Sequence, residues 1–184
     1  MFQQLLEQMA LALESRGIPY MLVGGPATLL YGEPRLTRDI GVALGTGPER
    51  WAEIVELAEA SGWQPLGDKK FVERTLVLPC IERASGIRID FVFSHLAFER
   101  QAMERVRRVP IGTAQVCFAS VEDLIIHKIA AGRPRDWEDV RGILLKKPEM
   151  DLPYVRRWLK EFEASFNEGF LERFETLRKA TAPD

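Results

Sequence analysis

Two aspartates and a pair of glycines are the residues of this 184-residue chain best suited to chemistry. Gly24-Gly25 follows an apolar, strand-like run, and a glycine turn between a strand and a helix exposes backbone N–H groups that can bind phosphate. Asp39 and Asp90 each lie in an otherwise apolar segment, where a carboxylate is costly to bury unless it is paired or binds a cation. Together these residues predict a divalent-metal site beside a phosphate-binding turn.

Each feature also has a purely structural interpretation. A Gly-Gly pair between a strand and a helix is more often a tight connection than a phosphate site. Asp39 could form an ion pair with Arg35 or Arg38, and Asp90 could pair with Arg88, which lies on the same face of the strand. The combination of two aspartates with the glycine turn favours the metal site over these alternatives.

The hydrophobic pattern predicts the elements that position these residues. Helices are expected at 2–16, from 26, at 49–60, 97–106, from 120, and at 136–146, 152–162 and 168–179; strands are expected at 19–23, 38–44, 71–72, 75–83, 87–94, 109–112 and 113–118. The strands 75–83 and 87–94 form a hairpin signature, in which Pro79 predicts an edge or a bulge. The pattern therefore indicates an α+β fold, with residues 1–119 as an α/β core and residues 120–184 as a helical part packed on it.

The amino-acid composition limits the classes of protein to which this chain can belong. Hydrophobic residues make up 46% and charged residues 28%, and the net charge of -2 gives no global field that would recruit nucleic acid. No apolar run approaches the roughly 20 residues that span a bilayer, and the N-terminus lacks a signal-peptide pattern, so no membrane partner is expected. Cys80 and Cys117 lie in apolar stretches and predict buried, reduced thiols in a cytoplasmic protein.

The motifs occur in an order that resembles the nucleotidyltransferase superfamily with its polymerase-β-like fold. Gly24-Gly25, Asp39 and Asp90 match the glycine turn and two of the aspartates of that pattern, over about residues 18–145. The run 32–40, Gly-Glu-Pro-Arg-Leu-Thr-Arg-Asp-Ile, resembles a branch that includes abortive-infection and toxin–antitoxin nucleotidyltransferases. Residues 120–128 and 135–140 are similar to the same branch.

The resemblance implies a mixed sheet flanked by helices and a magnesium-dependent transfer of a nucleoside monophosphate. The nucleoside triphosphate (NTP) is the substrate, and the acceptor is RNA, a protein or a small molecule, with tRNA and a partner protein as candidate partners. The implied nucleotide-binding residues are Gly24, Gly25, Thr37 and Arg38, the implied Mg²⁺ ligands are Asp39 and Asp90, and the implied catalytic residues are Asp39, Asp90 and Lys128. Lys128 could equally be a solvated helix residue.

The chain departs from the superfamily pattern at Gly41. Residues two apart on a strand share a face, so position 41 would point at the metal site beside Asp39, where the pattern has a second carboxylate. Glu33 or Glu82 could compensate. The departure leaves open an alternative function, a catalytically inactive relative that binds a nucleotide or a protein, for example in a toxin–antitoxin system.

The remaining charged residues have less specific interpretations. Asp136 and Asp139 share a helix face and could pair with Lys128 or nearby arginines, or could fix Lys128 for function. His95 and His127 have no ligand partner at suitable spacing and are expected to be structural. The arginines that could line a basic acceptor groove, or a merely solvated face, are Arg105, Arg107, Arg108, Arg133, Arg135 and Arg141.

Overall fold

A computed structural model describes residues 2–33, 37, 39–94, 96–146, 148–166 and 168–182. The chain forms two compact units. Unit 1 comprises Met1–Gly25 and Leu36–Ala119, and unit 2 comprises Pro26–Arg35 and Ser120–Asp184. None of the described helices is long and apolar enough to cross a membrane.

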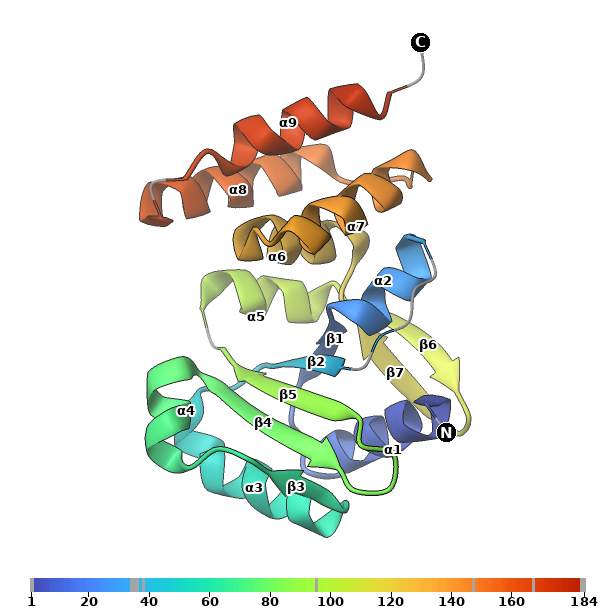
Figure 1. Cartoon of the computed structure of the whole chain (residues 1–184), viewed down its shortest axis with the longest axis vertical. Coiled ribbons are helices and arrows are strands. Elements are labelled where there is room, and N and C mark those ends of the chain that lie inside the picture. The colour runs from blue at the N-terminus through green and yellow to red at the C-terminus, as the bar shows by residue number, and fades with distance from the viewer. Residues whose placement is uncertain are drawn as a thin grey trace. The chain divides into compact units, whose positions relative to one another are not determined.

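Unit 1 is built on a seven-stranded mixed sheet with the order β3-β4-β5-β2-β1-β7-β6 (Figure 1). The strands are β1 (Tyr20–Val23), β2 (Asp39–Leu44), β3 (Trp63–Pro65), β4 (Val77–Glu82), β5 (Arg88–Phe93), β6 (Arg107–Ile111) and β7 (Ala114–Phe118). Strand β2 runs parallel to β5, and β1 runs parallel to β7, whereas the other neighbours are antiparallel. The expected α+β class with a mixed sheet is confirmed.

The alternation of residue types along β2 and β5 separates the two faces of the sheet. Ile40 and Val42 on β2, with Ile89 and Phe91 on β5, are fully buried and form one face. The residues between them are exposed or half-buried and form the opposite face: Asp39, Gly41, Arg88 and Asp90. One face therefore belongs to the core, and the other presents the residues that could do chemistry.

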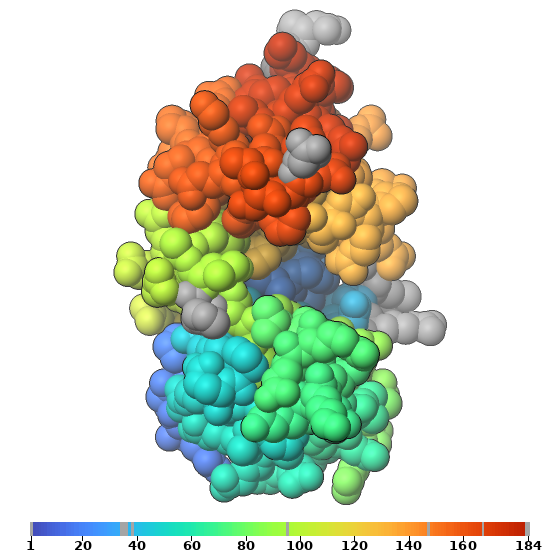
Figure 2. Space-filling view, turned by 90° about the vertical axis from the view of Figure 1, so that its left-hand side faces the viewer, coloured from blue at the N-terminus to red at the C-terminus, as the bar shows by residue number. Residues whose placement is uncertain are grey.

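Four α-helices are described in unit 1. They are α1 (Phe2–Ser15), α3 (Trp51–Ala60), which follows the short 3₁₀ turn η1 (Pro48–Arg50), α4 (Lys69–Thr75) and α5 (Ala97–Glu104). Helix α1 packs on β6 and β7 through an apolar stripe that includes Leu6, Met9 and Leu13. Figure 2 shows η1 and α3 (cyan) beside α4 (green), and a surface cavity of about 490 Å³ lies between these elements.

Unit 2 is helical. It contains α6 (Val121–Ala131), α7 (Pro134–Leu145), α8 (Leu152–Phe166) and α9 (Phe170–Ala180), together with most of α2 (Gly25–Tyr31). Helix α6 packs against α7 and α8, and α9 packs on α8 and α7 (Figure 1). Ser120 caps α6 by accepting a hydrogen bond from the Asp123 N–H, as the capping pattern predicts, and Gly132 ends the helix in the left-handed conformation.

The sequence-based prediction was wrong between residues 63 and 79. Phe71 and Val72, expected as a strand, lie in α4, because Asp68 caps the helix by accepting a hydrogen bond from the Phe71 N–H. The three-residue strand β3 was not predicted, and it covers part of β4, so β4 is not an edge strand. Although β4 is not an edge strand, Pro79 itself is not paired with β3, because the β3–β4 pairing ends at Cys80.

Candidate functional site

The register of two parallel strands places both aspartates on one face of the sheet. Asp39 pairs with Arg88 and Gly41 pairs with Asp90 in the β2–β5 ladder. Because paired residues and residues two apart point to the same side, Asp39, Gly41 and Asp90 share a face. Strand spacing and rise put the Cα atoms of Asp39 and Asp90 roughly 8 Å apart, a span that two aspartate side chains can bridge around one cation.

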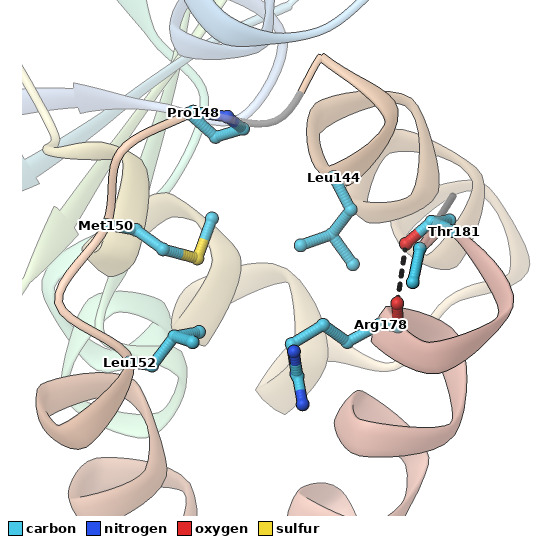
Figure 3. Close-up of a pocket in the computed structure, with 7 residues that line it drawn as sticks. Leu144, Pro148, Met150, Leu152, Arg178 and Thr181 are labelled. Carbon is cyan, nitrogen blue, oxygen red and sulfur yellow. Dashed lines mark hydrogen bonds between the residues drawn. The ribbon is translucent and has the colours of Figure 1, made fainter. Parts of the chain in front are cut away.

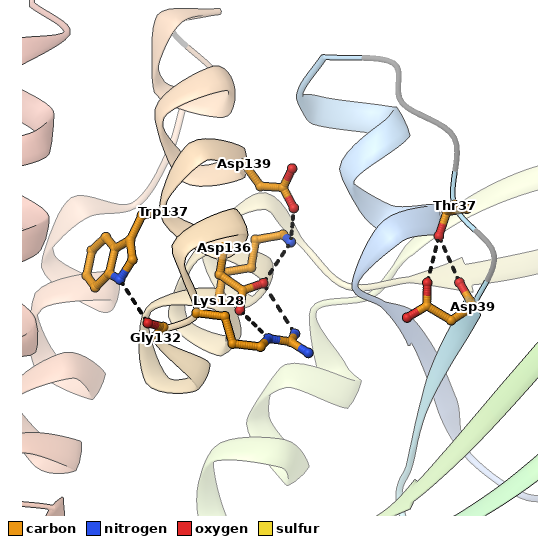
Figure 4. Close-up of polar contacts among 8 residues, drawn as sticks. Thr37, Asp39, Lys128, Gly132, Asp136, Trp137 and Asp139 are labelled. Atoms are coloured by element: carbon orange, nitrogen blue, oxygen red, sulfur yellow. Dashed lines mark hydrogen bonds and ion pairs between the residues drawn. The ribbon is translucent and has the colours of Figure 1, made fainter.

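Thr37 orients the carboxylate of Asp39. Its Oγ1 lies 3.1 Å from Asp39 Oδ1 and 2.9 Å from the Asp39 carbonyl oxygen, both of which accept hydrogen bonds (Figure 4). Asp39 is exposed at the start of β2 and accessible to a ligand. Arg38, expected to bind nucleotide, and Arg35 lie outside the described residues, as does the ion pair that either could form with Asp39.

The two glycines of the turn are required for different reasons. Gly24 has a φ of +67°, a left-handed conformation that other residues adopt at a cost. At Gly25 a Cβ atom would overlap the hydroxyl group of Thr37, so the turn lies directly against the segment that leads to Asp39. Val23, the residue before the turn, pairs with Gly41. The glycine turn and the aspartate face are therefore neighbours.

Asp90 forms the ion pair that the structural interpretation anticipated. Arg88 Nε donates to Asp90 Oδ1 at 2.8 Å. The side chains are 57% and 26% exposed, respectively, so both remain accessible to solvent. Arg88 thus adds a permanent positive charge to the face that carries the two carboxylates.

Gly41 lies on the face between Asp39 and Asp90 and supplies no oxygen ligand. A Cβ atom at this position would lie 3.0 Å from Cγ2 of Val23, so the valine methyl borders the space that a side chain would enter. Among the described residues, no group of three or more acidic, His or Cys side chains could hold a metal ion. The two carboxylates fit one Mg²⁺ that is also coordinated by substrate phosphates, and they do not suffice for a two-ion site.

Glu82, one of the two glutamates considered as replacements, does not share the face of the sheet that carries Asp39 and Asp90. Glu82 accepts hydrogen bonds from the Ser85 hydroxyl and from the N–H groups of Ala84 and Ser85, the latter two at 2.9 and 2.6 Å, and these bonds hold the pKa of Glu82 below its usual value. Strand alternation also puts Glu82 on the opposite face of the sheet from Asp90. Glu33 belongs to unit 2, where its carboxylate lies 3.8 Å from Lys146 Nζ.

Lys128 is buried in unit 2 between two aspartates (Figure 4). Its side chain is 4% exposed, and Nζ lies 2.5 Å from Asp139 Oδ2 and 3.4 Å from Asp136 Oδ1. Arg133 Nε donates to Asp136 Oδ2 at 2.6 Å. The interpretation of Lys128 as a solvated residue is wrong, and the pairing of Asp136 and Asp139 with Lys128 and Arg133 is confirmed.

Desolvation governs the ionisation of the other described titratable residues that the sequence singled out, His127, Cys80 and Cys117. Burial lowers the pKa of His127 to about 4, so the imidazole is neutral near pH 7. His95 lies outside the described residues. Cys80 and Cys117 are free and buried, as expected, and burial raises the pKa of both thiols, that of Cys80 to about 12.

The structure divides the six arginines between the two units. Arg107 and Arg108 are consecutive on β6 and point to opposite faces of the sheet. Arg133, Arg135 and Arg141 are exposed on unit 2. A basic acceptor groove therefore stays a prediction.

Unit 2 also contains surface cavities. One of about 230 Å³ lies near the end of α7 and is lined by apolar side chains that include Leu144, Met150 and Leu152, with Arg178 at its side (Figure 3). Arg178 Nε is held by Glu175 Oε2 at 3.0 Å. A second cavity of about 490 Å³ lies between α7 and α9, beside Trp137.

Sequence reasoning missed one residue of the candidate site, Val23. Arg88 was predicted to share a strand face with Asp90 and to pair with it, but no role towards a ligand was assigned to it. Val23 gave no signal, because its closeness to Gly41 depends on the pairing of β1 with β2.

Residues 1–180 match a family described as "Nucleotidyltransferase of unknown function (DUF6036)", and the chain belongs to this family. A search of curated proteins returned no match. The fold is similar to an antigenic nucleotidyltransferase-like protein from Paracoccidioides brasiliensis, with 16% identity and a TM-score of 0.60, covering 97% of this chain and 92% of that one.

Two further solved structures with a similar fold are described as an antibiotic-resistance factor and a lincosamide antibiotic adenylyltransferase. The antibiotic-resistance factor ANT(2'')-Ia is 18% identical, with a TM-score of 0.55 and coverage of 97% of this chain and 89% of its own. The lincosamide antibiotic adenylyltransferase LnuA is 15% identical, with a TM-score of 0.50 and coverage of 71% and 89%. At these identities the similarity shows the fold, which is that of the nucleotidyltransferase superfamily.

Proposed function

We propose that this protein binds an NTP together with Mg²⁺ at the face formed by Asp39 and Asp90, and transfers the nucleoside monophosphate to an acceptor hydroxyl group. The observation that carries the proposal is the register of β2 and β5, which puts both carboxylates on one face beside the glycine turn. The membership of the chain in a nucleotidyltransferase family supports the same reaction class.

Each group of the site has a role in this proposal. Asp39, oriented by Thr37, and Asp90 would hold Mg²⁺, which when bound neutralises charge on the phosphates. The turn at Gly24 and Gly25 lets the phosphates approach the backbone closely. Helix α2 has only seven residues, so the proposed site depends on the two carboxylates and not on a helix dipole.

The bonds exchanged are those of a nucleotidyl transfer. The acceptor oxygen forms a bond to the α-phosphorus, the bond from that phosphorus to the bridging oxygen breaks, and pyrophosphate leaves. The acceptor proton passes to Asp90, which lies on the accessible face of β5. Lys128 enters the proposal as the cation that ties α6 to α7, since its ammonium group is buried between two carboxylates.

The acceptor is a hydroxyl-bearing molecule in the cytoplasm: an RNA such as tRNA, a protein, or a small molecule. One structure of ANT(2'')-Ia contains adenylyl-2''-tobramycin, and the structure of LnuA is lincomycin-bound. These descriptions favour a small-molecule acceptor as the first class to test. A toxin–antitoxin setting, suggested by the run 32–40, would instead favour tRNA or a partner protein.

A second candidate function is supported by Gly41 and by the Arg88–Asp90 ion pair. A missing ligand and a paired carboxylate both weaken the hold on a metal ion. A protein with this site could bind a nucleotide, or a partner protein, without catalysing transfer.

Calorimetric titration with ATP, GTP, CTP and UTP, with and without Mg²⁺, tests nucleotide binding. We expect Mg²⁺-dependent binding that Asp39→Asn weakens by about tenfold or more, since an amide replaces a charged ligand. Asp68→Asn is the matched control, because Asp68 caps α4 and asparagine retains that cap. Absence of binding for all four nucleotides, with and without the metal, would rule out the proposed function.

Transfer is tested separately from binding. NTPs labelled at the α-phosphate are incubated with tRNA, with total protein and with hydroxylated small molecules, and label on an acceptor is measured. Label that depends on Asp39 and Asp90 supports the enzyme. Nucleotide binding without any transfer supports the binding module.

A further inference from the structure

The side chain of Arg88 occupies an unusual position in the site. Arg88 pairs with Asp39 in the β2–β5 ladder and bonds to Asp90 through Nε, so that it lies on the same face as both carboxylates and beside Gly41. The contact with Asp90 uses one of the five N–H donors of the guanidinium group. With 57% of the side chain exposed, the group remains accessible to a ligand from solvent.

The net charge of the carboxylates and metal ions that would face the triphosphate shows why a positive charge on Arg88 matters. A site with three carboxylates, two divalent ions and no arginine would present a net charge of about +1 to the triphosphate. Two carboxylates with one divalent ion are neutral together, and the guanidinium of Arg88 restores about +1. A fixed cation thus takes the place of one metal ion and one carboxylate.

We infer that Arg88 is a triphosphate-binding residue, whose guanidinium contacts the phosphates directly and compensates for the single-ion site left by Gly41. A guanidinium binds phosphate oxygens through paired, charge-assisted hydrogen bonds. The inference rests on the proposed function, because it assumes that the face with Asp39 and Asp90 receives a triphosphate. It adds a residue whose contribution does not pass through the metal.

Binding of ATP and of inorganic tripolyphosphate in EDTA isolates this contribution from that of Mg²⁺. The full chain is titrated by calorimetry as wild type, Arg88→Ala, Arg88→Lys, Asp90→Asn and the double variant Arg88→Ala with Asp90→Asn. Arg74→Ala is the control, because Arg74 is an exposed arginine on α4 of the same unit. Melting temperatures establish that each variant is folded.

We expect Arg88→Ala to weaken both ligands by about tenfold or more, and Arg88→Lys to weaken them less. The same loss should persist in the Asp90→Asn background, because the contact is with phosphate. Arg74→Ala should have no effect. If Arg88→Ala fails to fold, Arg88→Lys in both backgrounds gives the same test.

Two results would overturn the inference. A loss no greater than that of Arg74→Ala would show that Arg88 does not bind phosphate. A loss that vanishes in the Asp90→Asn background would show that Arg88 acts only by positioning Asp90. If either occurs while the wild type binds Mg-ATP, the proposed function stands; a wild type that binds no nucleotide overturns both.

Discussion

A Gly41→Asp substitution would add a third carboxylate to the face that carries Asp39 and Asp90. Position 41 lies opposite Asp90 in the ladder and two residues after Asp39, and its φ lies outside the left-handed range, so an aspartate is compatible with the backbone. Carboxylate oxygens are the ligands Mg²⁺ prefers. We expect Mg²⁺ affinity in the presence of ATP to rise by about tenfold, or about 1.4 kcal/mol.

The same substitution has a structural cost that can be estimated from Val23. The new Cβ atom would lie 3.0 Å from Cγ2 of Val23, tighter than ordinary packing. Overpacking of this kind costs about 1–3 kcal/mol, which lowers the melting temperature of a protein of this size by roughly 2–12 °C. Val23→Ala removes the contacting methyl, so the double variant should recover stability and show the full gain in metal affinity.

The assay compares the wild type, Val23→Ala, Gly41→Asp and the double variant. Calorimetric titration with Mg²⁺ in the presence of ATP gives the metal affinity, and release of pyrophosphate reports transfer. Val23→Ala is the matched control, because it changes packing without adding a ligand. A folded double variant whose Mg²⁺ affinity equals that of Val23→Ala would refute the argument that residue 41 faces a cation site.

Three further predictions concern buried charge, pH and the glycine turn. Asp139→Ala should lower the free energy of unfolding, measured in urea, by about 3–5 kcal/mol, because Lys128 keeps its buried charge after its 2.5 Å partner is removed. The double variant Lys128→Met with Asp139→Leu should lose less stability, because the buried charge is removed as well. An equal loss of stability in the two variants would contradict this reasoning. The pKa of His127 is about 4 in the folded protein and 6.5 in the unfolded chain, so about 3 kcal/mol of stability should be lost as the pH falls from 6.5 to 4. His127→Leu should flatten this dependence of the free energy of unfolding on pH. An unchanged pH dependence in the variant would contradict the prediction. Gly25→Ala should weaken Mg-ATP binding about tenfold or more, because its methyl group displaces Thr37 and with it Asp39; unchanged affinity in calorimetry would show that the turn does not shape the site.

The fold could be predicted from the sequence where an element is long enough to show its own period. Strand β5 alternates between buried and accessible residues along its whole length, β2 does so over residues 39–42, and the helices after Ser120 repeat apolar residues at helical spacing. Strand β3 has three residues, too few for an alternation to emerge. The apolar pair Phe71 and Val72 fits a strand or a helix equally well. The helix is favoured by the N-cap from Asp68, but aspartate is also common in loops, so the cap could not be recognised from the sequence.

The two aspartates of the candidate site could be singled out from the sequence, but the register of the strands that carry them could not be predicted. A carboxylate in an apolar strand is visible in the sequence, whereas the offset that puts Asp90 opposite Gly41 depends on how β2 and β5 pair across some 50 residues of chain. The environment of Lys128 could not be predicted from the sequence either. Its sequence position fits a solvated residue or a ligand contact, and only the packing of α6 on α7 shows that two aspartates bury it.

Gly41 has consequences on both sides of the strand that bears it, and these argue against a site that has merely lost a ligand. Deletion of a side chain alone would leave open space beside residue 41, and it would leave the carboxylates of Asp39 and Asp90 without a compensating protein cation. Instead, a methyl group of Val23 borders that space, and Arg88 is ion-paired with Asp90. Steric and electrostatic surroundings that both match glycine support the proposal of a site for a single metal ion, which is why Arg88 and Val23, rather than Gly41 alone, are the residues to vary.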